Sequence, residues 1–86
     1  MTKREEKLFF YFKSKNNGDL VDIFDIQKNT GYKASTINTY VRKKLFPFLK
    51  KSNGETVLIF EKKIFYSEIQ SLADFESHMS QKIRRF

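Results

Sequence analysis

The 86-residue sequence contains no cysteine, a single histidine and a single proline. Without cysteine, the chain cannot be a small secreted domain held by disulfides, and it cannot bind a metal through thiolates. A lone histidine such as His78 is more often a surface or packing residue than a catalytic base or a metal ligand. The sequence also has no Cys/His spacing of a zinc site and no glycine-rich phosphate loop. We therefore expect no enzyme activity, no cofactor and no metal.

Long apolar runs are missing as well. The apolar run from Leu8 to Phe12 has five residues, whereas a membrane-spanning helix needs roughly 20. The first six residues lack the apolar core of a signal peptide. These absences predict a chain without a membrane span that is located in the cytoplasm. The short length predicts one small domain.

Acidic residues are scarce in the middle of the chain. Lysine and arginine number 17 against 10 aspartates and glutamates, which gives a net charge of +7. No acid occurs from Ile26 to Gly54, and this stretch holds the cations Lys28, Lys33, Arg42, Lys43, Lys44, Lys50 and Lys51. A solvated face usually mixes both signs because like charges repel. The pattern predicts a surface for a polyanion, and the alternative is chance in a lysine-rich composition.

Local signals predict a chain made mostly of helices. The expected elements are helices over residues 2–15, 22–30, 34–46 and 67–82, a short strand at 20–21 and a hairpin over 48–60. Thr2 and Glu5 fit a capping box, Asp22 is a candidate N-cap, and Ser67 opens a second capping box. The Asn53–Gly54 pair favours the tight turn of the hairpin, because a type I′ turn needs positive φ at both central residues.

Residues 22–41 resemble the helix-turn-helix signature. In that motif two helices meet over a short turn, in which Gly31 would supply a positive φ and Tyr32 would fill the angle. The residues expected to bury the corner are Ile26, Ile37 and Val41. Two positions depart from the signature. Gln27 stands where a small residue is usual, and Lys33 replaces the usual helix-opening serine or threonine.

With the preceding helix and the following hairpin, the pattern is similar to the winged-helix family over roughly residues 5–62. The resemblance implies a mainly α fold with a small β-hairpin, in the order helix, short strand, helix, helix, two-stranded wing and C-terminal helix. We expect residues 1–66 to form the winged helix-turn-helix domain. Residues 67–86 then form a C-terminal helix that packs on the first helix or pairs with a second copy as a homodimer. Its apolar stripe is Ile69, Leu72, Phe75, Met79 and Ile83.

The third helix divides into two faces at 100° per residue. Ile37, Tyr40, Val41 and Leu45 lie on the apolar side. The polar side carries Ser35, Thr39, Arg42 and Lys43, with Thr36 and Asn38 at its margins. In a recognition helix, the first residues reach base edges and the later cations meet phosphates. Asparagine pairs with adenine and arginine with guanine, which we expect of Asn38 and Arg42, and Lys33 adds a phosphate-seeking charge. The alternative is an ordinary solvated face.

Two residues of this helix fit the wheel poorly. Lys44 falls on the apolar side and Phe46 on the polar side. We expect the helix to end near Phe46, because Pro47 disfavours a helical conformation in the residue before it. If the helix instead continues, Phe46 lies on its polar side and is expected to contact a thymine methyl or a partner protein.

The hairpin tip carries Lys50, Lys51 and Asn53, which would meet the phosphate backbone or the adjacent minor groove. The alternative is an edge strand protected by lysine against aggregation. The sequence thus predicts sequence-selective binding of double-stranded DNA, as a transcriptional regulator or as the DNA-targeting module of a larger protein. The rival is a winged-helix module that docks a protein. Binding of RNA or single strands and binding to a membrane surface are weaker alternatives.

Overall fold

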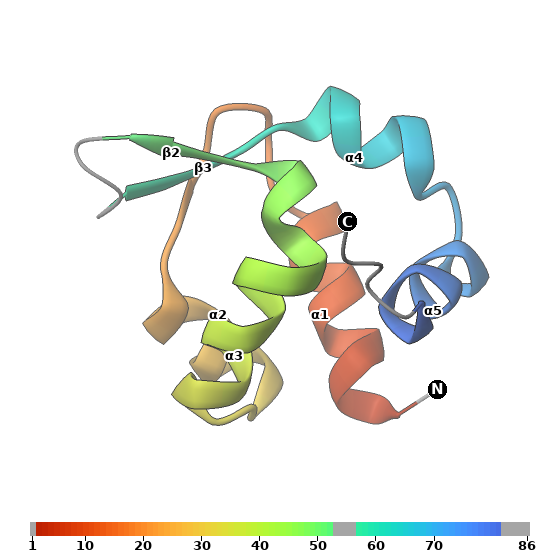
Figure 1. Ribbon diagram of the computed structural model, residues 1–86, viewed down its shortest axis with the longest axis horizontal. Coiled ribbons are helices and arrows are strands. Elements are labelled where there is room, and N and C mark those ends of the chain that lie inside the picture. Colours follow the sequence, from red (N-terminus) through yellow and green to blue (C-terminus); the bar gives the residue numbers. More distant parts are fainter. Residues whose placement is uncertain (1, 53–56, 82–86) are drawn as a thin grey trace, which may run out of the picture.

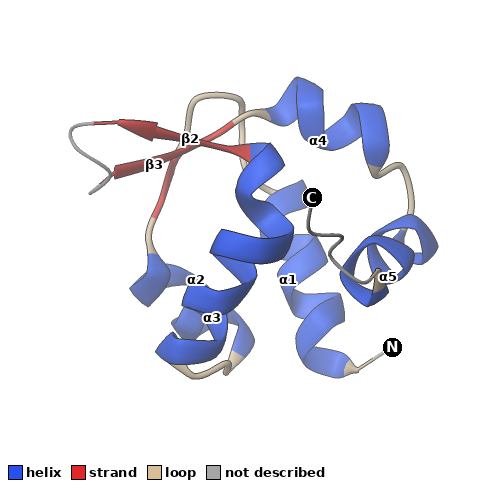
Figure 2. Cartoon of the chain, viewed as in Figure 1, coloured by secondary structure: helices blue, strands red, loops and turns tan. Residues whose placement is uncertain are grey.

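The computed structural model describes residues 2–52 and 57–81 (Figure 1). The elements in chain order are α1 (Lys3–Lys13), β1 (Leu20–Val21), α2 (Ile23–Thr30), α3 (Ala34–Tyr40), the π-helical turn η1 (Val41–Leu45), the 3₁₀ turn η2 (Phe46–Phe48), β2 (Leu49–Ser52), β3 (Val57–Phe60), α4 (Lys62–Glu68) and α5 (Leu72–Ser80). The described residues are mainly helical, with one small antiparallel sheet (Figure 2). This confirms the expected mainly α fold with a small β component.

The signals for the first two helices are confirmed. Thr2 caps α1, because its hydroxyl accepts from the Glu5 N–H at 3.2 Å while the Glu5 carboxylate accepts from the Thr2 N–H at 3.3 Å. Asp22 caps α2 by accepting from the N–H of Phe24 at 2.9 Å. Helix α2 ends at Gly31, whose φ of +81° is the left-handed conformation that glycine adopts freely.

The sheet has the strand order β1-β3-β2. The predicted short strand at 20–21 exists, and it pairs with β3 through Leu20 opposite Ile59. The hairpin of β2 and β3 projects away from α4 and α5 (Figure 1). The expected turn at Asn53 and Gly54 lies outside the described residues.

The third helix is less regular than expected, and its α-helical part is shorter than the predicted range 34–46. Its α-helical hydrogen bonds end at Tyr40, and the chain continues through η1 and η2 as far as Phe48. Pro47 lacks an N–H, so the α-helical pattern cannot pass through it. The change to a π-helical pattern already begins at Val41, ahead of Pro47, and β2 follows directly at Leu49.

The prediction of one helix over residues 67–82 is wrong. Two helices occupy this part of the chain, α4 from Lys62 and α5 from Leu72. Ser67 does not open a helix, since its hydroxyl donates to the Ile64 carbonyl within α4 at 2.7 Å. The N-cap of α5 is Ser71, which accepts from the Asp74 N–H at 3.2 Å. Between the two helices, Ile69 is extended and buried in the core.

The core is built around the ring of Phe65 on α4, which is fully buried. Five phenylalanine rings from four other elements surround it, with centroids 5.1 to 6.5 Å away. They are Phe9, Phe12, Phe48, Phe60 and Phe75. This cluster joins α1, η2, β3 and α5 in one core.

The last helix lies against α1. The rings of Phe75 and Phe9 are 5.6 Å apart, and both side chains are buried. Pairing with a second copy stays a prediction. Ile83, the end of the expected stripe, lies outside the described residues.

His78 ties α5 to the third helix. Its Nε2 lies 2.6 Å from the Lys44 carbonyl. Because a carbonyl only accepts, Nε2 carries the hydrogen in this contact. The imidazole also packs on Phe48, with ring centroids 5.0 Å apart. His78 is thus a packing residue.

A polar network joins α1 to α2. The Tyr11 hydroxyl donates to the Asp25 carboxylate at 2.8 Å, and the Lys15 ammonium lies 3.3 Å from the same oxygen. The hydrogen bond from Tyr11, with the help of Lys15, holds the pKa of Asp25 below its ordinary value. Burial and this carboxylate raise the pKa of Tyr11.

We expect Tyr11→Phe to lower the free energy of unfolding by about 1 kcal/mol at pH 7, because one hydrogen bond is lost while the ring stays. The bond favours ionised Asp25, whose pKa is lowered in the folded state. Its contribution is therefore complete above the unfolded pKa of about 4 and disappears as pH falls through the folded pKa. Urea unfolding at pH 7 and at low pH measures this, with Tyr66→Phe as control. An equal loss at both pH values would contradict it.

Candidate nucleic-acid interface

The turn between α2 and α3 fixes the direction of the third helix. Tyr32 follows Gly31 and is buried, and its ring meets Tyr40 edge to face at 5.4 Å between centroids. Burial raises the pKa of Tyr32 to about 12. The Thr30 hydroxyl, which the sequence did not single out, donates to the Ile26 carbonyl at 2.7 Å and accepts from the Tyr32 N–H at 3.3 Å. The turn is thus held by both apolar and polar contacts.

The two faces of the third helix are as the wheel predicts. Ile37, Val41 and Leu45 are buried, and Tyr40 packs partly against the core. The opposite face has Ser35, Asn38, Thr39, Arg42 and Lys43 exposed, with Thr36 half-buried. Lys33 occupies the N-cap position, is exposed and makes no capping hydrogen bond. The hydroxyl and amide groups therefore stand on the first turns, and the cations stand on η1.

The strand register separates the two lysines of β2, which the sequence treated as a pair. Lys51 is opposite Leu58 and Lys50 is opposite Ile59. Because successive side chains of a strand point to opposite faces, Lys51 shares the face of the buried Leu58, and Lys50 lies on the other face. Both lysines are exposed. Asn53 lies outside the described residues.

The third helix and the hairpin border one hollow of about 320 Å³. It is lined by Val41, Arg42, Phe46, Leu49, Lys51 and Leu58. Two cations from different elements thus stand beside an apolar floor. Lys50 and the residues of α3 do not line this hollow, so of the predicted site residues that the structure describes it brings together Arg42 and Lys51. We call it the helix–hairpin hollow.

Phe46 was not among the residues predicted to bind DNA and was considered only as an alternative contact for a thymine methyl or a partner. Its side chain is 57% exposed and lines the helix–hairpin hollow, while its neighbour Leu45 is fully buried. The sequence feature that pointed to its exposure was its position on the polar side of the helical wheel. The chain stays helical through η2, so Phe46 keeps that outward position.

The cations of this surface have no ion-pair partner among residues 2–52 and 57–81. Within the described residues, no carboxylate lies within ion-pair distance of Arg42, Lys43, Lys50 or Lys51. The described ion pair lies elsewhere, between Lys15 and Asp25 at 3.3 Å. The surface therefore attracts anions.

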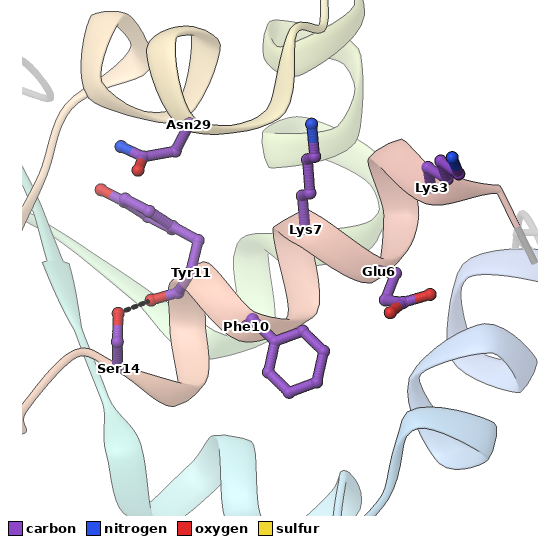
Figure 3. Close-up of a pocket in the computed structure, with 7 residues that line it drawn as sticks. All are labelled: Lys3, Glu6, Lys7, Phe10, Tyr11, Ser14 and Asn29. Carbon is purple, nitrogen blue, oxygen red and sulfur yellow. Dashed lines mark hydrogen bonds between the residues drawn. The ribbon is translucent and has the colours of Figure 1, made fainter.

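A larger hollow of about 500 Å³ between α1 and α2 has a different character (Figure 3). Lys3 and Lys7 line it together with Glu6, so its charges are mixed. Phe10 and Tyr11 point in different directions there (Figure 3). Nothing in this arrangement selects one kind of ligand.

Three neighbouring acids, Asp19, Asp22 and Asp25, serve local structure. Asp19 accepts from the Asn16 N–H at 2.8 Å, Asp22 caps α2, and Asp25 binds Tyr11. In the described part of the chain, no three His, Cys, Asp or Glu side chains come together as metal ligands would. None of the helices in that part is both long and apolar enough to cross a membrane.

Comparison with family models, with curated protein sequences and with solved structures finds no match to this chain. Any function must therefore be inferred from the surface itself.

Proposed function

We propose that this protein is a winged-helix protein that binds double-stranded DNA sequence-selectively, as a transcriptional regulator or as the targeting module of a larger protein. The observation that carries the proposal is the helix–hairpin hollow, where Arg42 of η1 and Lys51 of β2 stand together and make no ion pair with any carboxylate of the described residues. The element order, the strand order β1-β3-β2 and the Gly31 turn support the winged-helix assignment.

In this proposal α3 enters the major groove and reads bases with its first turns. Asn38 offers the amide that pairs with adenine, and Ser35 adds a hydroxyl. The Thr39 hydroxyl already donates to the Ser35 carbonyl at 3.0 Å. Its free lone pairs can therefore only accept, which suits the amino group of adenine or cytosine.

The cations bind the phosphate backbone. Lys33 precedes α3, Arg42 and Lys43 lie on η1, and Lys51 lies on the hairpin. Because Arg42 lines the same hollow as Lys51, we assign it to a phosphate rather than to the guanine expected from the sequence. Lys50, on the other face of the hairpin, contributes less.

A second candidate function, docking of a protein, is favoured by a different face. Leu20 is 65% and Phe24 76% exposed, and both line one hollow with Val57. Large exposed apolar side chains that gather at one place are typical of protein-binding surfaces. This face carries none of the cations of the helix–hairpin hollow.

We expect duplex DNA to bind with an affinity that falls steeply with salt. If about five cations neutralise phosphates, a plot of log affinity against log salt has a slope of about −4 to −5. Fluorescence anisotropy with a random-sequence duplex between about 50 and 200 mM salt measures it. Absence of binding at the lowest salt would reject DNA binding in favour of docking.

We expect mutations of base-reading residues and of phosphate-binding residues to have different effects on DNA binding. Asn38→Ala should change the preferred sequence, with a loss of roughly 1–3 kcal/mol at the base it reads. Lys51→Ala should weaken all duplexes alike and make the salt slope shallower by about 0.9. The test is a selection from random duplexes followed by titrations.

Two lysines serve as controls in the same titrations. Lys50→Ala should reduce affinity less than Lys51→Ala, and the exposed Lys63 of α4 should matter least. A change in preferred sequence for Lys51→Ala but not for Asn38→Ala would show that the roles of helix and hairpin are reversed.

A further inference from the structure

The cations of the helix–hairpin hollow have a role in the proposed function, but its apolar part does not. The Phe46 side chain is 57% exposed on a surface that is otherwise polar and cationic. Behind it, Val41, Leu49 and Leu58 form a buried apolar floor. A surface that only attracts phosphates needs no such floor.

We infer that the helix–hairpin hollow seats the backbone of one DNA strand, with a deoxyribose against Phe46 and its flanking phosphates on Arg42 and Lys51. The inference rests on the proposed function and assigns this apolar floor to the sugar.

The position of the hollow between two elements favours the backbone as its occupant. One side of the hollow comes from the third helix and the other from the hairpin. In the proposed function the helix lies in the major groove and the hairpin lies at the adjacent minor groove. Adjacent grooves of a duplex are separated by one sugar–phosphate strand. That strand must pass between the helix and the hairpin, and the hollow is the space between them.

The chemistry of the hollow matches this strand. A backbone unit presents an apolar sugar face between two anionic phosphates. The hollow presents an apolar ring and floor, with a cation from η1 and a cation from β2 at its edge. A protein partner with an apolar side chain would fill the floor but would leave two cations to be paired.

The conformation of the chain holds Phe46 in place. Pro47 has a fixed φ, and η2 places Phe48 in the core, where its ring lies 5.1 Å from that of Phe65. With Leu45 and Phe48 buried on either side, Phe46 is held outward. The contact is therefore pre-formed and needs little ordering when DNA binds.

The test compares variants of Phe46 with charge variants of the same hollow. Phe46→Ala should weaken binding to all duplexes about tenfold and leave the salt slope unchanged, because no charge is removed. Phe46→Leu should recover most of the affinity. Arg42→Ala should instead make the slope shallower by about 0.9. Phe24→Ala, which removes a more exposed phenylalanine from another face, is the control and should have no effect.

A fluorescence signal gives an independent readout. The chain has no tryptophan, so Phe46→Trp introduces a single fluorophore in the hollow and Phe24→Trp a matched one outside it. Saturating duplex should shift the emission of the first variant to shorter wavelength by displacing water, and leave the second unchanged. Circular dichroism of each variant checks that the fold is retained.

Three results would overturn the inference. Tryptophan at position 46 could report no change although anisotropy shows bound DNA, which would leave DNA binding intact. Phe46→Ala could alter preference at one base position, which would make Phe46 a base contact. Failure of the unmodified protein to bind any duplex would remove the proposed function together with this inference.

Discussion

The packing of aromatic rings around Phe65 is the constraint on which the rest of the structure depends. This ring is fully buried and contacts Phe48 of η2, whose ring centroid lies 5.1 Å away. Because Phe48 is the last residue before β2, the same contact fixes the end of the third helix and the start of the hairpin. A chain of this length buries a modest fraction of its surface, so such a large aromatic payload is needed to hold the elements together.

The proposed DNA-binding surface is a consequence of this anchoring. Leu45 and Phe48 are drawn into the core, and Phe46 between them is left outside. His78 adds a second anchor by donating to the Lys44 carbonyl at 2.6 Å. The helix end and the hairpin are therefore held together, which allows Arg42 and Lys51 to face one ligand.

Local chemistry made much of this fold predictable. Thr2 and Asp22 accept hydrogen bonds from N–H groups within three residues of themselves. Gly31 adopts the positive φ that the turn requires at its own position. The break between α4 and α5 was not predictable in this way. Residues 67–82 have helical spacing, but α4 ends at Ile69, whose side chain is buried, and α5 begins after Ser71. This break depends on packing in the tertiary core and not on local sequence.

The candidate site was predictable in composition but not in arrangement. The acid-free stretch and the polar face of the third helix identified the exposed residues. Alternation along β2 already places Lys50 and Lys51 on opposite faces. Which of the two shares the face of Leu58 depends on the strand register, and the hollow that joins Arg42 to Lys51 depends on how the helix meets the hairpin. Neither arrangement can be derived from the residue spacing within one segment. The helical wheel placed Phe46 on the polar side, where an apolar residue is unexpected. Its exposure in the fold is what makes it available to contact a ligand.

In the proposed function, one face made by the third helix and the hairpin binds duplex DNA. The most direct measurement is an NMR titration of the isotope-labelled protein with a duplex, which follows every backbone amide. If this face binds DNA, we expect shifts concentrated at residues 33–46 and 49–52, with the amides of α4 unchanged. Shifts centred on Leu20 and Phe24, with the third helix unaffected, would contradict it.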